Sequence, residues 1–327
     1  MAANPRLPVE NESVLEQYHI YHAEAQILSG HLKHPIKQPI EMAGHVVLEK
    51  TRREGHIMRS TAAASMEGLI SFKGGHTRAS GNKIEKKDLW GNAHSGWVTL
   101  STSVIEGLNV FEVLTADRIV AQVSTEHPVK NGHVPKVTFL GTRFENLRIG
   151  GYPVELELDL GICGSKPEND RPYLEDPDFL GRVEKQLEAV ADADDVPDTL
   201  SQEYKSKIVS IDDLRKKAKT GLNPSKDGSS SIHCSLVKKI GPIPIPGVKV
   251  FGNIIFIPDF GTVALAEIEA GLDPSLNEFG EKSTPVVAAR YDHSSYFTLN
   301  MLNMQLGCIG GGSVKAGTAK ANGMTRP

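Results

Sequence analysis

Cysteine is scarce in this chain. Its 327 residues contain only three, Cys163, Cys234 and Cys308. An odd, widely spaced set fits reduced, buried thiols in a cytoplasm better than a framework of disulfide bonds.

Long apolar runs are also absent. The first six residues lack the apolar core of a secretory signal, and no stretch approaches the roughly 18 apolar residues of a membrane helix. The most apolar segment, Phe251–Phe260, is interrupted by Gly252 and Pro258. The sequence therefore predicts no transmembrane segment and a cytoplasmic location. A cell-surface or extracellular location is expected instead if the sequence is a mature form.

Neither sign of charge dominates. Lysine and arginine total 36, aspartate and glutamate 40, and the net charge is −4. Nucleic-acid binding usually needs a concentrated basic face. The composition therefore predicts no nucleic-acid partner.

Glycine and proline are plentiful and lie mainly between apolar runs, as a turn-rich β protein requires. Apolar residues alternate with polar ones from Tyr18 onward and most clearly at Val154–Leu160, which is the period of a half-buried strand. We predict an all-β dominated fold: an antiparallel sandwich, barrel or β-roll. Further strands are expected at Gly44–Lys50, His56–Met66, Leu69–Phe72, Trp97–Ile105, Leu108–Leu114, Arg118–Ser124, Val137–Leu140, Val248–Ile257, Thr262–Ile268, Val286–Arg290 and Tyr296–Gln305.

One six-residue sequence motif occurs twice. Glu67–Phe72 (EGLISF) recurs as Glu106–Phe111 (EGLNVF), with a weaker echo at Phe144–Ile149. Glycine pairs such as Gly74-Gly75 and Gly150-Gly151 allow the positive φ angles of hairpin turns. The repeat predicts a stack of β-hairpins, which concerns architecture and not chemistry.

A helical insertion is expected near residues 170–222. Asp176 followed by Pro177 is typical of a helix start, and apolar residues follow at helical spacing. Ser210 with Asp213 resembles a capping box that begins a further helix. The predicted organisation is an amino-terminal arm and first strand (1–40), a β-rich region (41–166), the helical insertion (167–228), and a β-rich region that completes the sheet system (229–327).

The segment 102–160 resembles bacterial choice-of-anchor P proteins. The shared features are the Gly-Leu strand at Thr102–Leu108, the Thr-Ala-Asp turn at Thr115–Val120, and the Asn-Leu-x-Ile-x-Gly type of strand at Thr142–Gly150. The resemblance implies a bacterial cell-surface protein with no known enzymatic activity or functional residues. The sequence departs from that family because no signal peptide or carboxy-terminal anchor is visible.

Histidine is the residue type most suited to chemistry. Ten of the twelve histidines precede residue 134, and clustered imidazoles bind metals or act as acid and base near neutral pH. A site assembled from distant strands would use the following histidines and carboxylate partners: His45, His56, His76, His94, Glu67 and Glu106. The competing interpretation is that these histidines are structural, because no His-x-His or His-Glu-x-x-His spacing is present.

Other motifs are weaker. Asp192, Asp194, Asp195 and Asp198 lack the ligand order of an EF-hand and predict a solvated loop. The glycine run 310–312 lacks the Lys-Ser/Thr of a P-loop, and no Gly-x-Ser-x-Gly elbow occurs. No cofactor is predicted.

Three functions remain open, the third being a lipid- or pigment-binding barrel. The first is a non-catalytic structural or binding protein that self-associates into a homo-oligomer, since free strand edges favour pairing between subunits. The second is an enzyme with a His/carboxylate site, with or without a metal, in a β-barrel or inter-sheet cleft.

Overall fold

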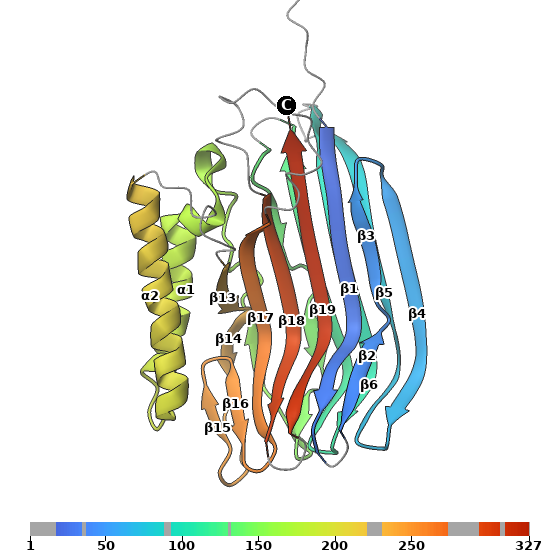
Figure 1. Cartoon of the computed structure of the whole chain (residues 1–327), viewed down its shortest axis with the longest axis vertical. Coiled ribbons are helices and arrows are strands. Elements are labelled where there is room, and N and C mark those ends of the chain that lie inside the picture. The colour runs from blue at the N-terminus through green and yellow to red at the C-terminus, as the bar shows by residue number, and fades with distance from the viewer. Residues whose placement is uncertain are drawn as a thin grey trace, which may run out of the picture.

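The structure is a computed structural model. It describes residues 18–34, 37–87, 93–129, 132–220, 231–273, 294–307 and 311–326. Two large antiparallel sheets lie face to face, with a pair of helices at one side (Figure 1). The all-β prediction is confirmed, and the arrangement is a sandwich.

The first large sheet, sheet A, combines strands from both ends of the chain. Its order is β15 (Lys249–Phe251), β16 (Ile254–Ile257), β17 (Gly261–Asp273), β18 (Ser294–Leu306), β19 (Gly312–Arg326), β1 (Tyr18–Leu32) and β2 (Gln38–Ala43). β13 (Ser231–Ser235) also pairs with β17, and β3 (Val46–Thr51) with β1.

The second large sheet, sheet B, is built from one continuous part of the chain. Its order is β11 (Tyr152–Pro153), β10 (Arg148–Ile149), β7 (Leu114–Pro128), β6 (Ala93–Val110), β5 (Ile70–Lys87) and β4 (Gly55–Met66). β8 (Lys136–Thr138) and β9 (Arg143–Glu145) also pair with β7, and β12 (Leu156–Leu158) forms a separate pair with β14 (Val237–Ile240).

Small side chains fill part of the space between the sheets. Ala23 and Ala25 of β1 are fully buried. From β6, the Ser101 hydroxyl donates to the Glu24 carbonyl oxygen at 2.5 Å, and the Ser103 hydroxyl donates to that of Gln26 at 2.8 Å. These buried hydroxyls are therefore paired with backbone of the facing sheet, which offsets the cost of removing them from water.

Gly74-Gly75 was expected to be a turn, and this prediction is wrong. Both residues lie inside β5, which runs unbroken from Ile70 to Lys87. A Cβ atom on Gly75 would lie 2.3 Å from the Val104 carbonyl oxygen of β6. The absence of a side chain at Gly75 therefore allows β5 and β6 to approach each other closely. Gly150-Gly151 does form the expected turn, with φ angles of +54° and +82°.

The two copies of the repeated six-residue motif do not occupy equivalent positions in the fold. The Glu67-Gly68-Leu69 part of its first copy forms the turn between β4 and β5, where Glu67 has a φ angle of +49°. The Glu106-Gly107-Leu108 part of the second copy lies within β6. Val154–Leu160 is also less regular than its alternation predicts, because only Leu156–Leu158 forms a strand.

The predicted helical insertion is confirmed. Two short 3₁₀ turns, Glu168–Asp170 and Tyr173–Glu175, precede α1 (Pro177–Ala191) and α2 (Asp198–Thr220). Ser210 starts no new helix: it lies inside α2, and its hydroxyl donates to the Ser206 carbonyl oxygen at 3.1 Å. Ile211 and Leu214 are buried and continue the apolar face of α2 beyond that point.

Three contacts hold the insertion. Arg215 of α2 donates to both carboxylate oxygens of Glu184 on α1, at 2.9 and 2.7 Å. Phe179 of α1 packs edge-on against Tyr173, with ring centroids 5.3 Å apart, and Tyr173 packs the same way on Phe297 of β18 at 5.1 Å. This aromatic cluster ties the helices to sheet A. Within the described part of the chain, no helix has both the length and the hydropathy needed to span a membrane.

The start of α1 gives a testable prediction. A carboxylate oxygen of Asp176 accepts a hydrogen bond from the Phe179 backbone N–H at 3.0 Å. Asp176→Ala should lower the free energy of unfolding by about 1 kcal/mol, because the substitution leaves that N–H without its cap. Chemical denaturation measures the change, and Asp178→Ala is the matched control. Equal losses in the two variants would contradict the capping role.

Candidate functional site

His45 is the one sequence-predicted candidate with a carboxylate partner of its own among the contacts described. Its Nε2 atom lies 2.9 Å from Oε1 of Glu24 on β1. The side chains are 28% and 35% exposed, respectively, so water screens the pair. Glu24 was not among the predicted partners, since its place beside the β2–β3 turn depends on strand pairing.

The other candidates are spread over sheet B. His56 is exposed at the start of β4, Glu67 is exposed in the β4–β5 turn, and His94 lies in β6 opposite Lys86. His76 of β5 lies opposite Val104, which makes it a diagonal neighbour of Glu106 on β6. Glu106 is exposed, with Oε1 4.0 Å from Nε of Arg118.

No metal cluster forms from these residues. In the described ranges, no group of three or more histidine, cysteine, aspartate or glutamate side chains is placed to hold an ion. The aspartates 192, 194 and 195 lie in the loop between α1 and α2, and Asp198 begins α2. Asp195 is 3.4 Å from the Lys249 ammonium. Trp97 is buried, and the predicted strand Val286–Arg290 falls outside the described residues.

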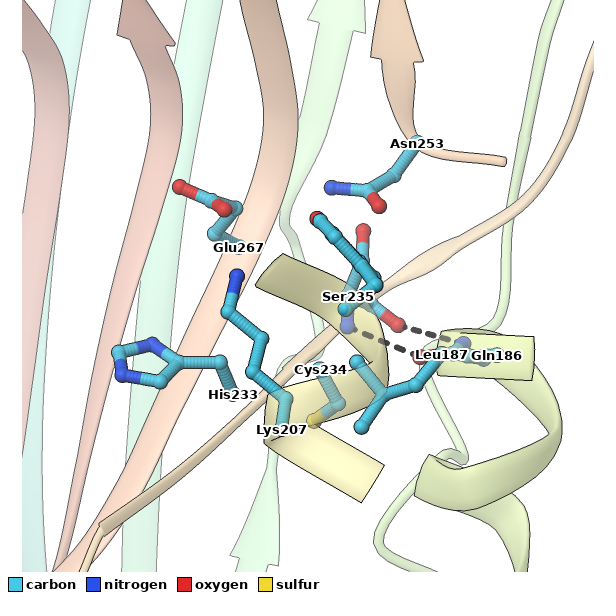
Figure 2. Close-up of a pocket in the computed structure, with 9 residues that line it drawn as sticks. Gln186, Leu187, Lys207, His233, Cys234, Ser235, Asn253 and Glu267 are labelled. Carbon is cyan, nitrogen blue, oxygen red and sulfur yellow. Dashed lines mark hydrogen bonds between the residues drawn. The ribbon is translucent and has the colours of Figure 1, made fainter. Parts of the chain in front are cut away.

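A small pocket lies where the helices meet β13 and β17. Figure 2 shows Lys207 extending toward Glu267, with His233 on one side of it and Cys234 on the other. Gln186 of α1 pairs reciprocally with Ser235: its amide nitrogen donates to the Ser235 carbonyl oxygen at 2.9 Å, and its amide oxygen accepts from the Ser235 N–H at 3.0 Å. The free volume is about 10 Å³, room for one water molecule.

The groups around this pocket are already engaged. Burial, reinforced by the charge of Glu267, raises the pKa of Cys234 to about 12, so its thiol is neutral at physiological pH. Lys207 pairs with Glu203 at 2.8 Å, and Glu267 accepts a hydrogen bond from Asn303 at 2.7 Å. The pocket holds neither an activated nucleophile nor room for a substrate, and its contacts instead join the helices to sheet A.

A wider, polar hollow lies before α1. It has a volume of about 230 Å³ and is lined by residues 165–169, 171, 176–178 and 182. Lys166 pairs with Asp170, and Arg182 donates to the carbonyl oxygens of Ile162 and Cys163 at 2.7 and 3.0 Å. Cations and carboxylates therefore mix in this hollow, which gives it no preference for a ligand of either charge.

β4 is a long and highly exposed strand. It ends sheet B on the side away from the helices (Figure 1) and pairs only with β5 among the described strands. All of its twelve residues are exposed or half-exposed, and Ile57 and Met58 are 39% and 57% exposed. A strand at the edge of a sheet presents backbone N–H and C=O groups that have no partner within the sheet.

Two histidines that were not among the candidates lie together between the sheets. His19 of β1 and His127 of β7 are fully or almost fully buried, and their ring centroids are 4.7 Å apart. The alternation along β1 predicts that His19 is buried, because His19 lies on the same face of the strand as Tyr21, Ala23 and Ala25. None of the candidates His45, His56, His76 and His94 belongs to this pair.

Comparison with known proteins places the chain in one family. The model of a domain of unknown function, DUF8256, matches residues 19–270, and the chain belongs to this family. The match spans β1 to β17 and includes the helical insertion. No curated protein and no solved structure matches the chain. The resemblance of segment 102–160 to choice-of-anchor P proteins stays a prediction.

Proposed function

We propose that this protein is a non-catalytic β-sandwich scaffold that self-associates through the free edge of β4. The observation that carries the proposal is the exposure of this strand on both faces, together with the absence of a second strand partner among the described residues. Its length also supports pairing, because twelve residues exceed a typical strand.

The protection usual at sheet edges is weak along β4. Natural edge strands are often very short or carry proline, a bulge or several charges. β4 pairs with β5 without a shift of register and contains no proline. Arg59 is its one residue of fixed charge, and the segment Ala62-Ala63-Ala64 presents only methyl groups.

A second copy of the same strand fits this edge. When a two-fold axis relates two antiparallel strands, each residue of one strand lies opposite a residue of the other strand. The two residues are equally far from the residue on the axis, in opposite directions along the sequence. An axis at Thr61 places Arg59 opposite Ala63 and Met58 opposite Ala64. Like charges then do not oppose each other, and the two copies of sheet B continue across the axis as one sheet.

Light scattering coupled to size-exclusion chromatography tests the proposal. The unmodified chain should have the mass of a dimer. Ala62→Lys combined with Ala64→Lys should give a monomer, because four lysines then crowd the paired strands. The matched control adds two lysines at exposed apolar positions elsewhere, Leu140→Lys and Val209→Lys, and should remain dimeric.

Two outcomes would overturn the proposal. One is a strict monomer for the unmodified chain. The other is a dimer that persists in the β4 lysine variant, which would assign self-association to another surface.

A further inference from the structure

Two buried histidines meet between the sheets at one end of the sandwich. His19 is next to the first residue of β1, and His127 is next to the last residue of β7. The Trp97 ring of β6 stacks on that of His19, with centroids 5.5 Å apart, and Tyr21 meets the same ring edge-on at 4.7 Å. Burial, reinforced by the charge of Glu54, raises the pKa of the Tyr21 hydroxyl. The aromatic neighbours of the imidazoles are therefore uncharged.

One nitrogen of each ring holds a neighbouring segment. Nδ1 of His127 lies 2.7 Å from the Gly132 carbonyl oxygen, so Nδ1 carries the hydrogen, and the lone pair of the neutral ring is on Nε2. Nδ1 of His19 shares a hydrogen bond of 2.9 Å with the Thr325 hydroxyl, near the end of β19. Nδ1 of His133 donates to the Thr325 carbonyl oxygen at 3.0 Å. Histidines from β1 and from the segment after β7 thus both contact the end of β19.

The other nitrogen of each ring has no hydrogen-bond partner. Nε2 of His19 and Nε2 of His127 are both buried and unpaired in the described structure. A Cβ atom on Gly323 of β19 would lie 2.6 Å from the first and 3.2 Å from the second. The contacts from β19 and β6, made by Gly323, Thr325 and Trp97, bring no opposite charge. A proton added to either ring would therefore leave a buried imidazolium with an unpaired N–H, which is costly.

Nearby charges do not offset the cost of burial. Burial lowers the pKa of His127 from 6.5 to about 4. His133 and Lys166 lower this pKa further, and Asp170, which forms an ion pair with Lys166, raises it. Burial, followed by the charge of His127, lowers the pKa of His19 well below its usual value. With ring centroids 4.7 Å apart, a second charge on the pair would cost still more than the first.

We propose that His19 and His127 form an acid-sensitive latch. The neutral imidazoles hold the paired ends of β1 and β19 against β6 and β7, and uptake of a proton by either ring releases these ends. His19 lies opposite Thr325 in the register of the two strands, and Tyr21 lies opposite Gly323, so the two ends move together. The latch lies apart from the β4 edge and does not depend on self-association.

The direction of the pH effect follows from the proton balance. In the open form water surrounds both imidazoles, which then titrate near 6.5, whereas the pKa of His127 in the closed form is about 4. The open form therefore binds more protons below pH 6.5, and acid favours it. Between pH 7 and pH 5 the equilibrium constant for opening should rise about 20-fold through His127 alone. His19 acts in the same direction. Above pH 7 the constant no longer depends on these two rings.

Hydrogen exchange of the native full chain tests the latch. Exchange is followed by mass spectrometry at pH 7 and pH 5, and each rate is divided by the intrinsic rate at that pH. Peptides that contain residues 323–326 should lose protection by at least about 20-fold at the lower pH. A peptide that covers residues 104–119 is the internal control and should keep its protection, because it lies at the opposite ends of β6 and β7.

Asparagine substitutions remove the titration. An asparagine amide can donate in the place of Nδ1 and takes up no proton in this range. His19→Asn combined with His127→Asn should therefore give residues 323–326 equal protection at pH 7 and pH 5. His127→Asn alone is a milder variant and should reduce the response to pH by about 20-fold. His56→Asn removes an exposed histidine and should respond as the unmodified chain does.

The proposal is overturned if residues 323–326 of the unmodified chain keep their protection at pH 5. Equal loss of protection at residues 104–119 would also overturn it, because the whole sandwich would then be unfolding. The same holds if His127→Asn responds to pH as strongly as the unmodified chain, or if His56→Asn removes the response.

Discussion

Phe179→Ala is expected to lower the free energy of unfolding by about 3–5 kcal/mol, the cost of removing a large aromatic ring from a packed core. Phe179 is completely buried. Its ring lies against Tyr173 and, with centroids 6.5 Å apart, against Phe297 of sheet A. The substitution therefore opens a cavity at the junction that joins the helices to the sandwich. Denaturation by urea or guanidinium, followed by circular dichroism, measures the loss.

Val209→Ala is the control for this substitution. Val209 lies on α2 and is 59% exposed, so its truncation should change stability by no more than about 0.5 kcal/mol. A loss below about 1 kcal/mol for Phe179→Ala would mean that the helices are not packed against β18 in solution as the structure has them.

Cys163 and Cys234 are expected to resist thiol reagents in the folded protein. Only the thiolate reacts, and burial raises the pKa of Cys234 from 9.0 to about 12. Three pKa units reduce the thiolate fraction at pH 8 by about a thousandfold. Burial, with a further contribution from Cys234, raises the pKa of Cys163 well above its usual value. The Cys234 thiolate should form only as the pH approaches 12 or as the chain unfolds.

A disulfide reagent such as dithionitrobenzoate measures this reactivity. Both cysteines should react within seconds in denaturant and stay unmodified in the native state, with the modified residues located by peptide mapping. Fast native modification of Cys234 would show that the contact between the helices and β13 opens readily.

The fold class follows from sequence because two-residue alternation is a local property. Apolar residues on one side of a strand predict burial of that side, as β1 shows. Asp176 and Pro177 likewise predict the start of α1 correctly. Both signals depend on neighbours in the chain, which a single sequence displays directly.

The errors arise where distant strands decide the outcome. Gly74-Gly75 has the composition of a turn, but the approach of β6 holds it in a strand. Ser210 and Asp213 have the spacing of a capping box, but burial of Ile211 and Leu214 keeps α2 continuous. In each case packing between elements outweighs the local preference.

The candidate histidines illustrate the same limit. Whether two imidazoles meet depends on which strands face each other across the sandwich, and no local pattern states this. His19 and His127 meet because β1 and β7 belong to facing sheets. The alternation of apolar and polar residues along a strand predicts which histidines point into the sandwich. Which of these histidines become neighbours depends on the strands that face each other across it.

The order of strands in sheet A bears on how the chain acquires its shape during synthesis. β19 lies between β1 and β18, so strands near opposite ends of the chain become neighbours. Sheet B, whose hairpins are close in sequence, can begin to assemble while the ribosome is still translating. β1 must wait for residues 312–326 to emerge, and its apolar surface is meanwhile a target for chaperones.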